Sequence, residues 1–159
     1  MKNSKNAFTM IELIFVIVVL GILAGVAIPK MAATRDDAQI AKGRSDIASI
    51  RSAIVTERQT RLIKGDSAFI TSLHDTSGST YFDGNGSSTL LMYGIAPDSV
   101  KDGHWHSAST PTLVSGYYVT TYKFRVLGVD NTFTYTQADG KFDCNITGTS
   151  APSCEQLTK

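Results

Sequence analysis

The 159-residue sequence lacks the short patterns on which many catalytic sites depend. It contains no G-x-S-x-G nucleophile turn and no glycine loop of the kind that cradles phosphate. It has only two cysteines, and once these are paired no thiol is left for a histidine to activate. We therefore expect no enzymatic activity and no cofactor.

A strong net charge is also missing, because 15 basic and 14 acidic side chains nearly cancel. The balance nevertheless changes along the chain: the net charge is +1 over residues 1–29, +4 over 30–64 and −4 over 65–159. Phosphate would be repelled by the acidic part, so we do not expect nucleic acid as a partner. The polarity predicts instead that Arg51 and Arg58 of one copy meet the acidic part of a neighbouring copy.

Cys144 and Cys154 stand ten positions apart in a C-terminal stretch rich in Asn, Thr, Gly and Ser. A disulfide would staple this stretch, and it would require an oxidising compartment. Two free thiols in a reducing cytosol are the alternative. The existence of the bridge and the export of the C-terminal part therefore depend on each other.

Charged residues are absent from Leu13 to Ile28, within a hydrophobic run that begins at Phe8. A helix over residues 8–28 would span roughly 30 Å, the thickness of a hydrocarbon core. Lys2 and Lys5 precede the run, but basic residues also follow it closely, so charge alone does not decide the orientation. The short N-terminal tail and the cysteine pair favour a C-terminal part on the outer side of the membrane.

Glu12 is the one acidic residue in this hydrophobic run. A carboxylate at the edge of a hydrocarbon core costs on the order of a few kcal/mol unless it is partnered or wet. No basic residue lies between Ala7 and Val19, so we expect a cation from another molecule. An α-amine exposed by cleavage before Phe8 could be this cation. The simpler alternative is that Glu12 lies among the lipid headgroups, where water solvates it.

The residues Ala7-Phe8-Thr9-Met10-Ile11-Glu12-Leu13 and the run after them resemble the signal of type IV prepilins and type II secretion pseudopilins. In that family a membrane aspartyl peptidase cuts before the Phe on the cytoplasmic side and methylates the new amine. The resemblance implies cleavage between Ala7 and Phe8, N-methylation of Phe8, and a role for Glu12 in registering each incoming subunit. The family usually has Gly at the position of Ala7, and both residues are small enough for a tight protease subsite.

Two other interpretations of the segment remain. An ordinary secretory signal could be cut after Ala27, although the run is long for one and Glu12 would interrupt it. An unprocessed single-pass anchor would leave Glu12 unexplained. Gly21, Gly25 and Pro29 weaken the helix and allow close helix packing, so we assign them to assembly and expect residues 21–29 to unwind in a filament.

Residues 30–64 predict an amphipathic helix that continues the first one. Its apolar stripe contains Ile40, Gly43, Ile47, Ile50 and Ile54, with Ala41, Ala48, Val55 and Leu62 beside it. We interpret its basic side chains as a solvated face. Lys64-Gly65 predicts the end of the helix.

Residues 65–159, which we call the head, predict a small antiparallel sheet. Residues 66–115 give no clear order of elements. The alternation from Tyr118 to Val126 predicts a strand, Asp130-Asn131 a turn, residues 132–136 a second strand, and Asp139-Gly140 a turn before a third. The expected fold class is α+β, with a long N-terminal helix packed on a small sheet, and it resembles the pilin fold.

Two short patterns suggest metals, and we expect neither to hold one. His104 and His106, with His74, are interpreted as loop residues, because the first two are expected on opposite faces of any strand. Asp83-Gly84-Asn85-Gly86 resembles the start of a calcium loop, but the glutamate that would close such a loop is absent.

The expected organisation is a leader at residues 1–7, a transmembrane and polymerisation helix at 8–29, an amphipathic helix at 30–64 and the head at 65–159. We expect a structural subunit of a type IV pilus-like filament, either a pilin or a pseudopilin. Its partners would be further copies, prepilin peptidase, an inner-membrane assembly platform and the lipid bilayer. A membrane-tethered periplasmic binding module with an uncut signal is the alternative. The sequence does not separate surface pilus, secretion pseudopilus and competence pilus.

Overall fold

The computed structural model describes residues 8–86, 88–146 and 151–158. The chain divides into two compact units, residues 1–37 and residues 38–159, which are described separately below. The predicted leader, residues 1–7, lies outside the described residues.

One helix, α1 (Met10–Ile63), contributes to both units. It is slightly shorter at each end than the helix expected from the sequence, and it is uninterrupted at Pro29. It ends as predicted, because Gly65 has a φ of 85° that favours glycine. The Gly65 and Asp66 N–H groups donate to the carbonyls of Leu62 and Arg61, which satisfies the last turn.

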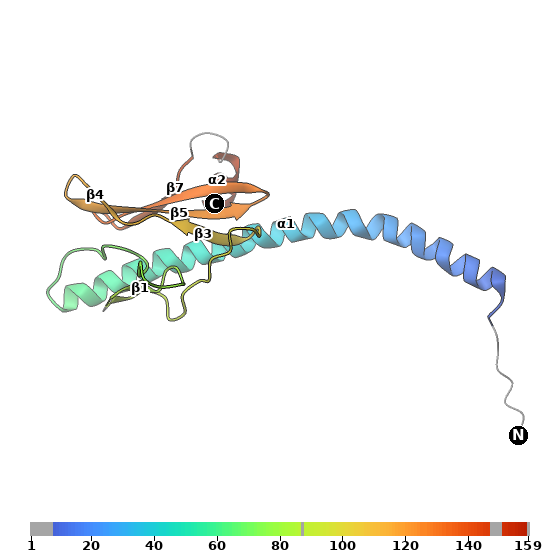
Figure 1. The fold of residues 1–159 in the computed structure, drawn as a ribbon, viewed down its shortest axis with the longest axis horizontal. Coiled ribbons are helices and arrows are strands. Elements are labelled where there is room, and N and C mark those ends of the chain that lie inside the picture. Colours follow the sequence, from blue (N-terminus) through green and yellow to red (C-terminus); the bar gives the residue numbers. More distant parts are fainter. Residues whose placement is uncertain (1–7, 87, 147–150, 159) are drawn as a thin grey trace, which may run out of the picture. The chain divides into compact units, whose positions relative to one another are not determined.

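In the second unit, one face of α1 is buried against a sheet (Figure 1). Ile47, Ile50 and Ile54 are at most 2% exposed. The prediction that the residues beside this stripe also cover the sheet is wrong, because Ala41, Ala48, Val55 and Leu62 are exposed. These four residues repeat every seven positions, which places them along a neighbouring side of the helix rather than on the buried stripe.

The sheet has the strand order β3-β5-β6-β7, and β4 also pairs with β5. The strands are β3 (His104–Ala108), β4 (Thr112–Val114), β5 (Tyr117–Val126), β6 (Val129–Thr136) and β7 (Lys141–Cys144). All pairings are antiparallel. The predicted three-stranded meander is therefore confirmed as β5-β6-β7, and the α+β class with it.

The turn predicted at Asp130-Asn131 is wrong. Both residues belong to β6, where they pair with Arg125 and Phe124. The chain reverses instead at Leu127 and Gly128, whose φ angles are 54° and 72°. Two positive φ angles are typical of the tight turn that matches strand twist. Asn131 was misleading because its side chain is buried and bonds backbone carbonyls inside the sheet.

Residues 66–103 cover more of the core than the sequence indicated. They contain the short strands β1 (Gly84–Asn85) and β2 (Ser88–Thr89), which pair with each other. They also supply Ile70, Leu73 and Phe82, all at most 1% exposed. Phe82 packs edge-on against Trp105 of β3 with ring centroids 4.9 Å apart. The aromatic centre of the head thus joins this segment to the sheet.

The C-terminal stretch forms a helix, α2 (Ala151–Thr158), which the sequence did not predict. Cys154 of α2 is disulfide-bonded to Cys144 of β7, with their Cα atoms 5.7 Å apart. Leu157 of α2 is buried beside Gly43 and Phe124. The described part of α2 is therefore held by both a covalent bond and apolar packing.

Candidate functional site

The start of α1 carries the residues to which the sequence assigns processing and assembly. Phe8 is 83% exposed and precedes the helix. The Thr9 N–H and hydroxyl donate to Glu12 Oε2 at 2.9 and 2.8 Å, and the Glu12 N–H donates to the Thr9 hydroxyl at 3.3 Å. This reciprocal pair is a capping box, which satisfies N–H groups that the first turn leaves unpaired.

Among the described residues, Glu12 therefore has hydrogen-bond donors but no cation beside it. The partner predicted for Glu12 from the sequence was a cation, and Thr9 was not predicted. The spacing Thr-x-x-Glu before an apolar run was the signal that would have identified the cap. A depression of about 400 Å³ beside the carboxylate is lined by Phe8, Ile11, Glu12, Phe15 and Val16.

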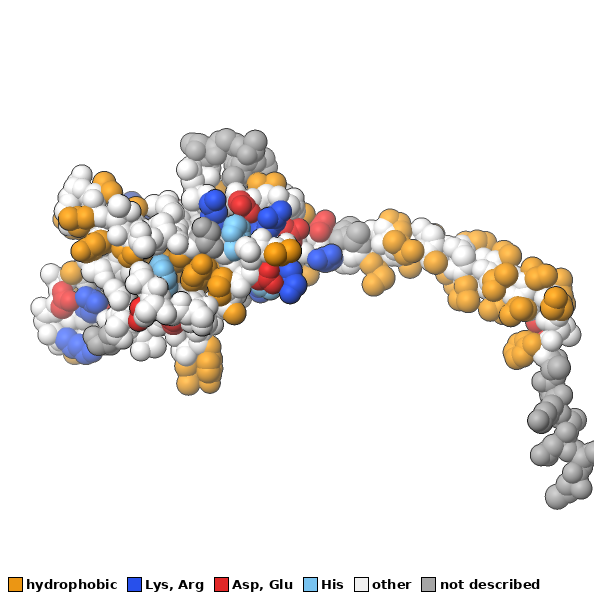
Figure 2. Space-filling view, in the orientation of Figure 1, with side chains coloured by type: hydrophobic (Ala, Val, Ile, Leu, Met, Phe, Trp, Pro, Cys, Tyr) orange, Lys and Arg blue, Asp and Glu red, His pale blue; other side chains and the backbone are white. Residues whose placement is uncertain are grey.

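The apolar side chains of the first unit are not covered by other parts of the described chain. The α1 helix contains an 18-residue window with a mean hydropathy of 2.9, none of which is buried, so by length and composition it could cross a membrane. Hydrophobic side chains are seen along this part of the helix in Figure 2. A helix that is apolar on all sides needs lipid or protein around it.

Gly21 and Gly25 lie in this uncovered segment, and neither has a neighbouring atom within 4 Å of an added Cβ. Pro29 lies inside the helix and has no N–H to donate to the Gly25 carbonyl. The three residues thus combine open space around the helix with a weakened backbone. Their assignment to assembly stays a prediction.

The basic side chains of the second half of α1 are exposed or half-exposed, but they have partners that the sequence interpretation did not include. They donate hydrogen bonds to groups that follow the helix in the same chain. The residues that do so are Lys42, Arg44, Arg51, Arg58 and Arg61. These cations attach the helix to its own head.

Arg51 and Arg58 show why the expected contact with a neighbouring copy needs revision. Arg51 donates to the Phe142 carbonyl at 3.0 Å and to the Asp143 carboxylate at 3.1 Å. Arg58 donates to the Ser67 carbonyl at 2.6 Å and lies 3.9 Å from the centroid of the Phe69 ring. Both guanidinium groups already have partners in their own chain.

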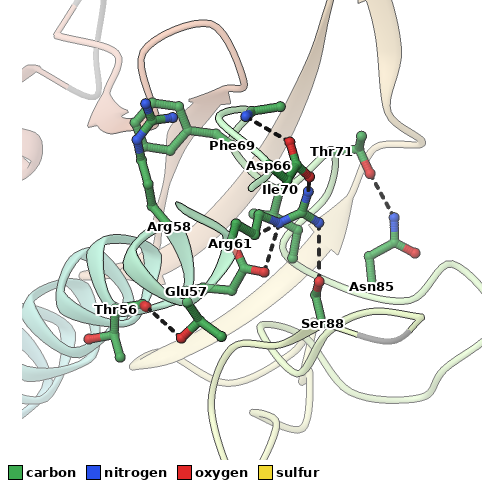
Figure 3. A network of polar contacts seen from close by, with 12 residues as sticks. Thr56, Glu57, Arg58, Arg61, Asp66, Phe69, Ile70, Thr71, Asn85 and Ser88 are labelled. Carbon is green, nitrogen blue, oxygen red and sulfur yellow. Dashed lines mark hydrogen bonds and ion pairs between the residues drawn. The ribbon is translucent and has the colours of Figure 1, made fainter. Parts of the chain in front are cut away.

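A polar network is centred on Arg61 (Figure 3). Its Nε donates to both oxygens of Glu57, at 2.8 and 3.1 Å, and Glu57 is only 7% exposed. Its two terminal nitrogens donate to Asp66 at 2.7 Å and to Ser88 at 3.1 Å. The Ala68 N–H donates to Asp66 and helps to hold the pKa of that carboxyl below its ordinary value.

A cavity of about 580 Å³ lies beside this network. Glu57, Arg61 and Asp66 all line it, but they pair with one another and satisfy each other's charge. The network joins the end of α1 to Asp66 and to β2. We interpret it as structural and assign no ligand to the cavity.

The histidines do not lie in loops as expected. His104 and His106 are on β3, and because residues two apart in a strand share a face, the expectation of opposite faces is wrong. His106 Nε2 lies 3.0 Å from Asp130, and His104 Nδ1 lies 3.1 Å from the Asp102 carbonyl. His74 is buried elsewhere, with its Nδ1 2.9 Å from the Tyr122 hydroxyl.

Asp83, the first residue of the calcium-like pattern, has structural partners. It accepts hydrogen bonds from the Thr80 hydroxyl at 2.7 Å and from the Asp75 N–H at 3.4 Å. Within residues 8–86, 88–146 and 151–158, no three His, Cys, Asp or Glu side chains are grouped so as to hold a metal ion.

Comparisons with known proteins bear on the N-terminal part. A family model described as the prokaryotic N-terminal methylation motif matches residues 2–28. The type II secretion system core protein G of Klebsiella michiganensis is 38% identical over 53 residues, which are 33% of this chain and 37% of that protein. Core protein G of Pseudomonas aeruginosa is 34% identical over the same shares. The chain thus spans less than two-fifths of the length of these relatives, and no solved structure matches it significantly.

The fold and the N-terminal motif together define a pilin-like protein, with a methylation signal leading into one long helix and an antiparallel sheet packed on that helix. The N-terminal part of the chain carries the prokaryotic N-terminal methylation motif and is similar to type II secretion system core protein G.

Proposed function

We propose that this protein is a structural subunit of a type IV pilus-like filament. One observation carries the proposal: an uncovered apolar helix segment with a single carboxylate near its start. Before assembly, lipid would surround this segment, which makes the protein a single-pass protein of the bacterial inner membrane with its head in the periplasm. In the filament, the helices of other copies would take the place of the lipid.

Maturation precedes assembly in this proposal. Prepilin peptidase removes residues 1–7 by cutting between Ala7 and Phe8, and the new amine of Phe8 is methylated. The high exposure of Phe8 ahead of the helix is consistent with access to a protease. An inner-membrane platform then adds the subunit to a filament, and the similarity to core protein G favours a secretion pseudopilus over a surface pilus.

Glu12 acts as the contact between successive subunits. Its capping bonds with Thr9 are neutral-donor hydrogen bonds, whereas the amine of a neighbour's Phe8 would supply a full positive charge. The depression lined by Phe8, Ile11 and Phe15 is where that terminus would lie. An ion pair shielded from water by these apolar side chains is stronger than one on an open surface.

The segment from Gly21 to Pro29 unwinds on assembly. It is helical in the isolated chain, where Pro29 already leaves the Gly25 carbonyl without its helical donor. Each glycine lowers helix stability by about 1 kcal/mol relative to alanine, so this stretch is the easiest part of the uncovered segment to open.

Mass spectrometry of the protein extracted from its own cell membranes tests the proposal. A chain that begins at Phe8 and carries one N-methyl group is the expected result. An intact Met1 would overturn it in favour of a membrane-tethered periplasmic binding module. Shearing cells and probing the medium then separates the filament types, because a surface pilus is released in quantity and a pseudopilus is not.

A further inference from the structure

The hairpin of β4 and β5 carries four large apolar side chains that remain largely exposed. Leu113, Val114, Tyr117 and Tyr118 are between 38% and 62% exposed. Leu113 stands across from Tyr118 and Val114 across from Tyr117, so each face of the hairpin presents one of these pairs. Hydrophobic side chains are seen in Figure 2 at the end of the head where Figure 1 places β4. Apolar side chains gathered on a surface indicate a site of protein contact.

The outer edge of β4 is open, because among the described strands β4 pairs only with β5. The Tyr118 N–H donates to Gln137 Oε1 at 3.1 Å, and the Tyr118 carbonyl accepts from the Gln137 N–H at 2.9 Å. Both backbone groups of Tyr118 therefore point away from β4. Leu113, across from Tyr118, is thus in a non-hydrogen-bonded pair, and its own N–H and carbonyl point to the open edge.

The geometry of the hairpin limits the open edge to this one residue. Ser115 and Gly116 have φ angles of 52° and 87°, typical of a two-residue turn whose flanking residues, here Val114 and Tyr117, bond each other. Pro111, just before β4, has no N–H to donate. Leu113 is therefore the residue of β4 that offers both a donor and an acceptor to an added strand.

The edge also lacks the charges that usually keep edge strands of two molecules apart. No charged residue lies between His106 and Lys123. Lysine on an edge strand is a common protection against pairing with another copy, and it is missing here. A strongly charged partner would find no opposite charge on this edge. A second copy presents the same neutral, apolar hairpin, and its Leu113 offers the matching donor and acceptor.

We propose that two heads pair edge to edge through β4, with the two strands antiparallel and a two-fold axis at Leu113. Each Leu113 N–H donates to the Leu113 carbonyl of the other copy, and Thr112 stands across from Val114 of the other copy. The four apolar side chains of each hairpin lie beside those of the other. This contact goes beyond the proposed function, because a two-fold contact closes on itself and cannot extend a filament.

The size of the apolar patch predicts a weak contact. Large side chains present about 150–250 Å² each when fully exposed, so the four together offer on the order of 400 Å² per copy. A stable interface of standard size uses about 800 Å² per partner. We therefore expect pairing where copies are held close together, as in a membrane, rather than a tight dimer in dilute solution.

Cysteine cross-linking of the full chain in the membranes of its own cells tests the proposal. In the proposed pair, Thr112 and Val114 of the other copy have Cα atoms about 4.5 Å apart, which a disulfide can bridge. Cells that make both Thr112→Cys and Val114→Cys chains should yield at least about tenfold more cross-linked dimer than cells that make Thr112→Cys and Met92→Cys chains. Met92 is the control because it is 84% exposed on the head, outside β4. Equal yields would overturn the proposal.

Leu113→Pro, introduced into both cysteine-bearing chains, tests the backbone bonds. Proline is tolerated on an edge strand and removes the outward N–H, whereas Leu113→Ala shortens the side chain and keeps that N–H. We expect severalfold less cross-linking with Leu113→Pro than with Leu113→Ala. Equal cross-linking in the two variants would overturn the pairing of β4 with β4.

The mass of the product identifies the occupant of the edge. Twice the mass of the chain supports pairing of two copies, whereas any other mass would show that a different protein occupies the edge and would overturn the proposal. Variants are compared only where the Cys144–Cys154 disulfide has formed, which confirms that the head is folded. The N-terminal mass of the same samples reports cleavage and methylation at Phe8 separately, so a failed cross-link leaves the proposed function standing.

Discussion

Gly43 shows how one residue sets the contact between two elements that are far apart in the sequence. It lies on the buried face of α1, and a Cβ placed there would be 2.6 Å from both Leu157 Cδ2 and Phe124 Cε1. Contacts of this length force side chains out of their rotamers. The absence of a side chain therefore allows α2 and β5 to approach the helix.

Gly43→Ala should accordingly destabilise the protein. Overpacking of a core costs about 1–3 kcal/mol, and the better helix propensity of alanine offsets about 1 kcal/mol of that. We expect a net loss of up to about 2 kcal/mol in the free energy of unfolding, measured by urea titration of the full chain in detergent. Ser45→Ala, at an exposed position of the same helix, is the control and should be neutral or slightly stabilising. A Gly43→Ala protein more stable than the wild type would contradict this account.

His74 should make stability depend on pH. Burial lowers the pKa of its imidazole below the ordinary value of 6.5, although the carboxylates of Asp83 and Asp75 act in the opposite direction. Below about pH 6.5 the unfolded chain binds a proton that the folded chain resists, so stability is lost as the pH falls from there towards the pKa of the folded state. The free energy of unfolding should therefore be lower at pH 5 than at pH 7.

The measurement is the difference in unfolding free energy between pH 7 and pH 5. His74→Gln should remove most of the dependence in this range, whereas His104→Gln, at a half-exposed position, should retain it. Equal slopes in the wild type and His74→Gln would show that other groups dominate.

At the scale of elements, the Glu57–Arg61 pair fixes the end of α1 to the segment after it. Arg61→Met would leave Glu57 buried without its partner, and breaking a buried pair costs about 3–5 kcal/mol. The double variant Glu57→Leu with Arg61→Met removes both charges and should be clearly more stable than Arg61→Met alone. Arg58→Met, which loses an exposed hydrogen bond to the Ser67 carbonyl and a contact with the Phe69 ring, should cost only about 1–2 kcal/mol. Urea unfolding of the three variants would contradict this interpretation if the double variant were the least stable.

Periodicity explains which elements were predictable from the sequence. The stripe of Ile47, Ile50 and Ile54 and the alternation from Tyr118 to Val126 repeat over long segments, so the helix and the meander could be identified. Strands β1 and β2 have two residues each, too few for a period to show. They depend on long-range packing around Phe82 and Trp105, which a single sequence does not reveal.

The candidate site was predictable in its residue types but not in its bonding. Glu12 could be identified because a carboxylate in an apolar run is exceptional. Its capping partner Thr9 was overlooked, although the spacing was present in the sequence. The carbonyl partners of Arg51 and Arg58 were beyond prediction, because the backbone carbonyls of Phe142 and Ser67 carry no sequence signal.

At the scale of the whole molecule, more of the basic side chains pair with acidic groups of their own chain than the sequence indicated. The basic second half of α1 and the acidic head have opposite net charges, and the bonds from Arg51 to Asp143 and from Arg61 to Asp66 join them. Fewer cations therefore remain for attraction between copies. In the proposed filament, the specific contact between copies would then depend on the N-terminal segment, where Glu12 is the only charged side chain in the hydrophobic run.

Glu12→Gln and Thr9→Val separate two roles of Glu12, which caps the start of α1 and supplies the negative charge for the proposed ion pair. Gln in the third helical position also closes a capping box, so Glu12→Gln keeps the start of α1 and removes only the negative charge. Thr9→Val removes the side-chain part of the cap and keeps the charge.

A hydrogen bond to a charged group contributes about 1 kcal/mol more than a neutral one, which is roughly five- to tenfold in the association constant at each added subunit. Because a filament repeats this contact many times, we expect Glu12→Gln to reduce sedimentable filament at least tenfold, with unchanged helix content by circular dichroism. Thr9→Val should still form filaments, and the reverse ranking of the two variants would show that the cap, rather than the ion pair, is what assembly requires.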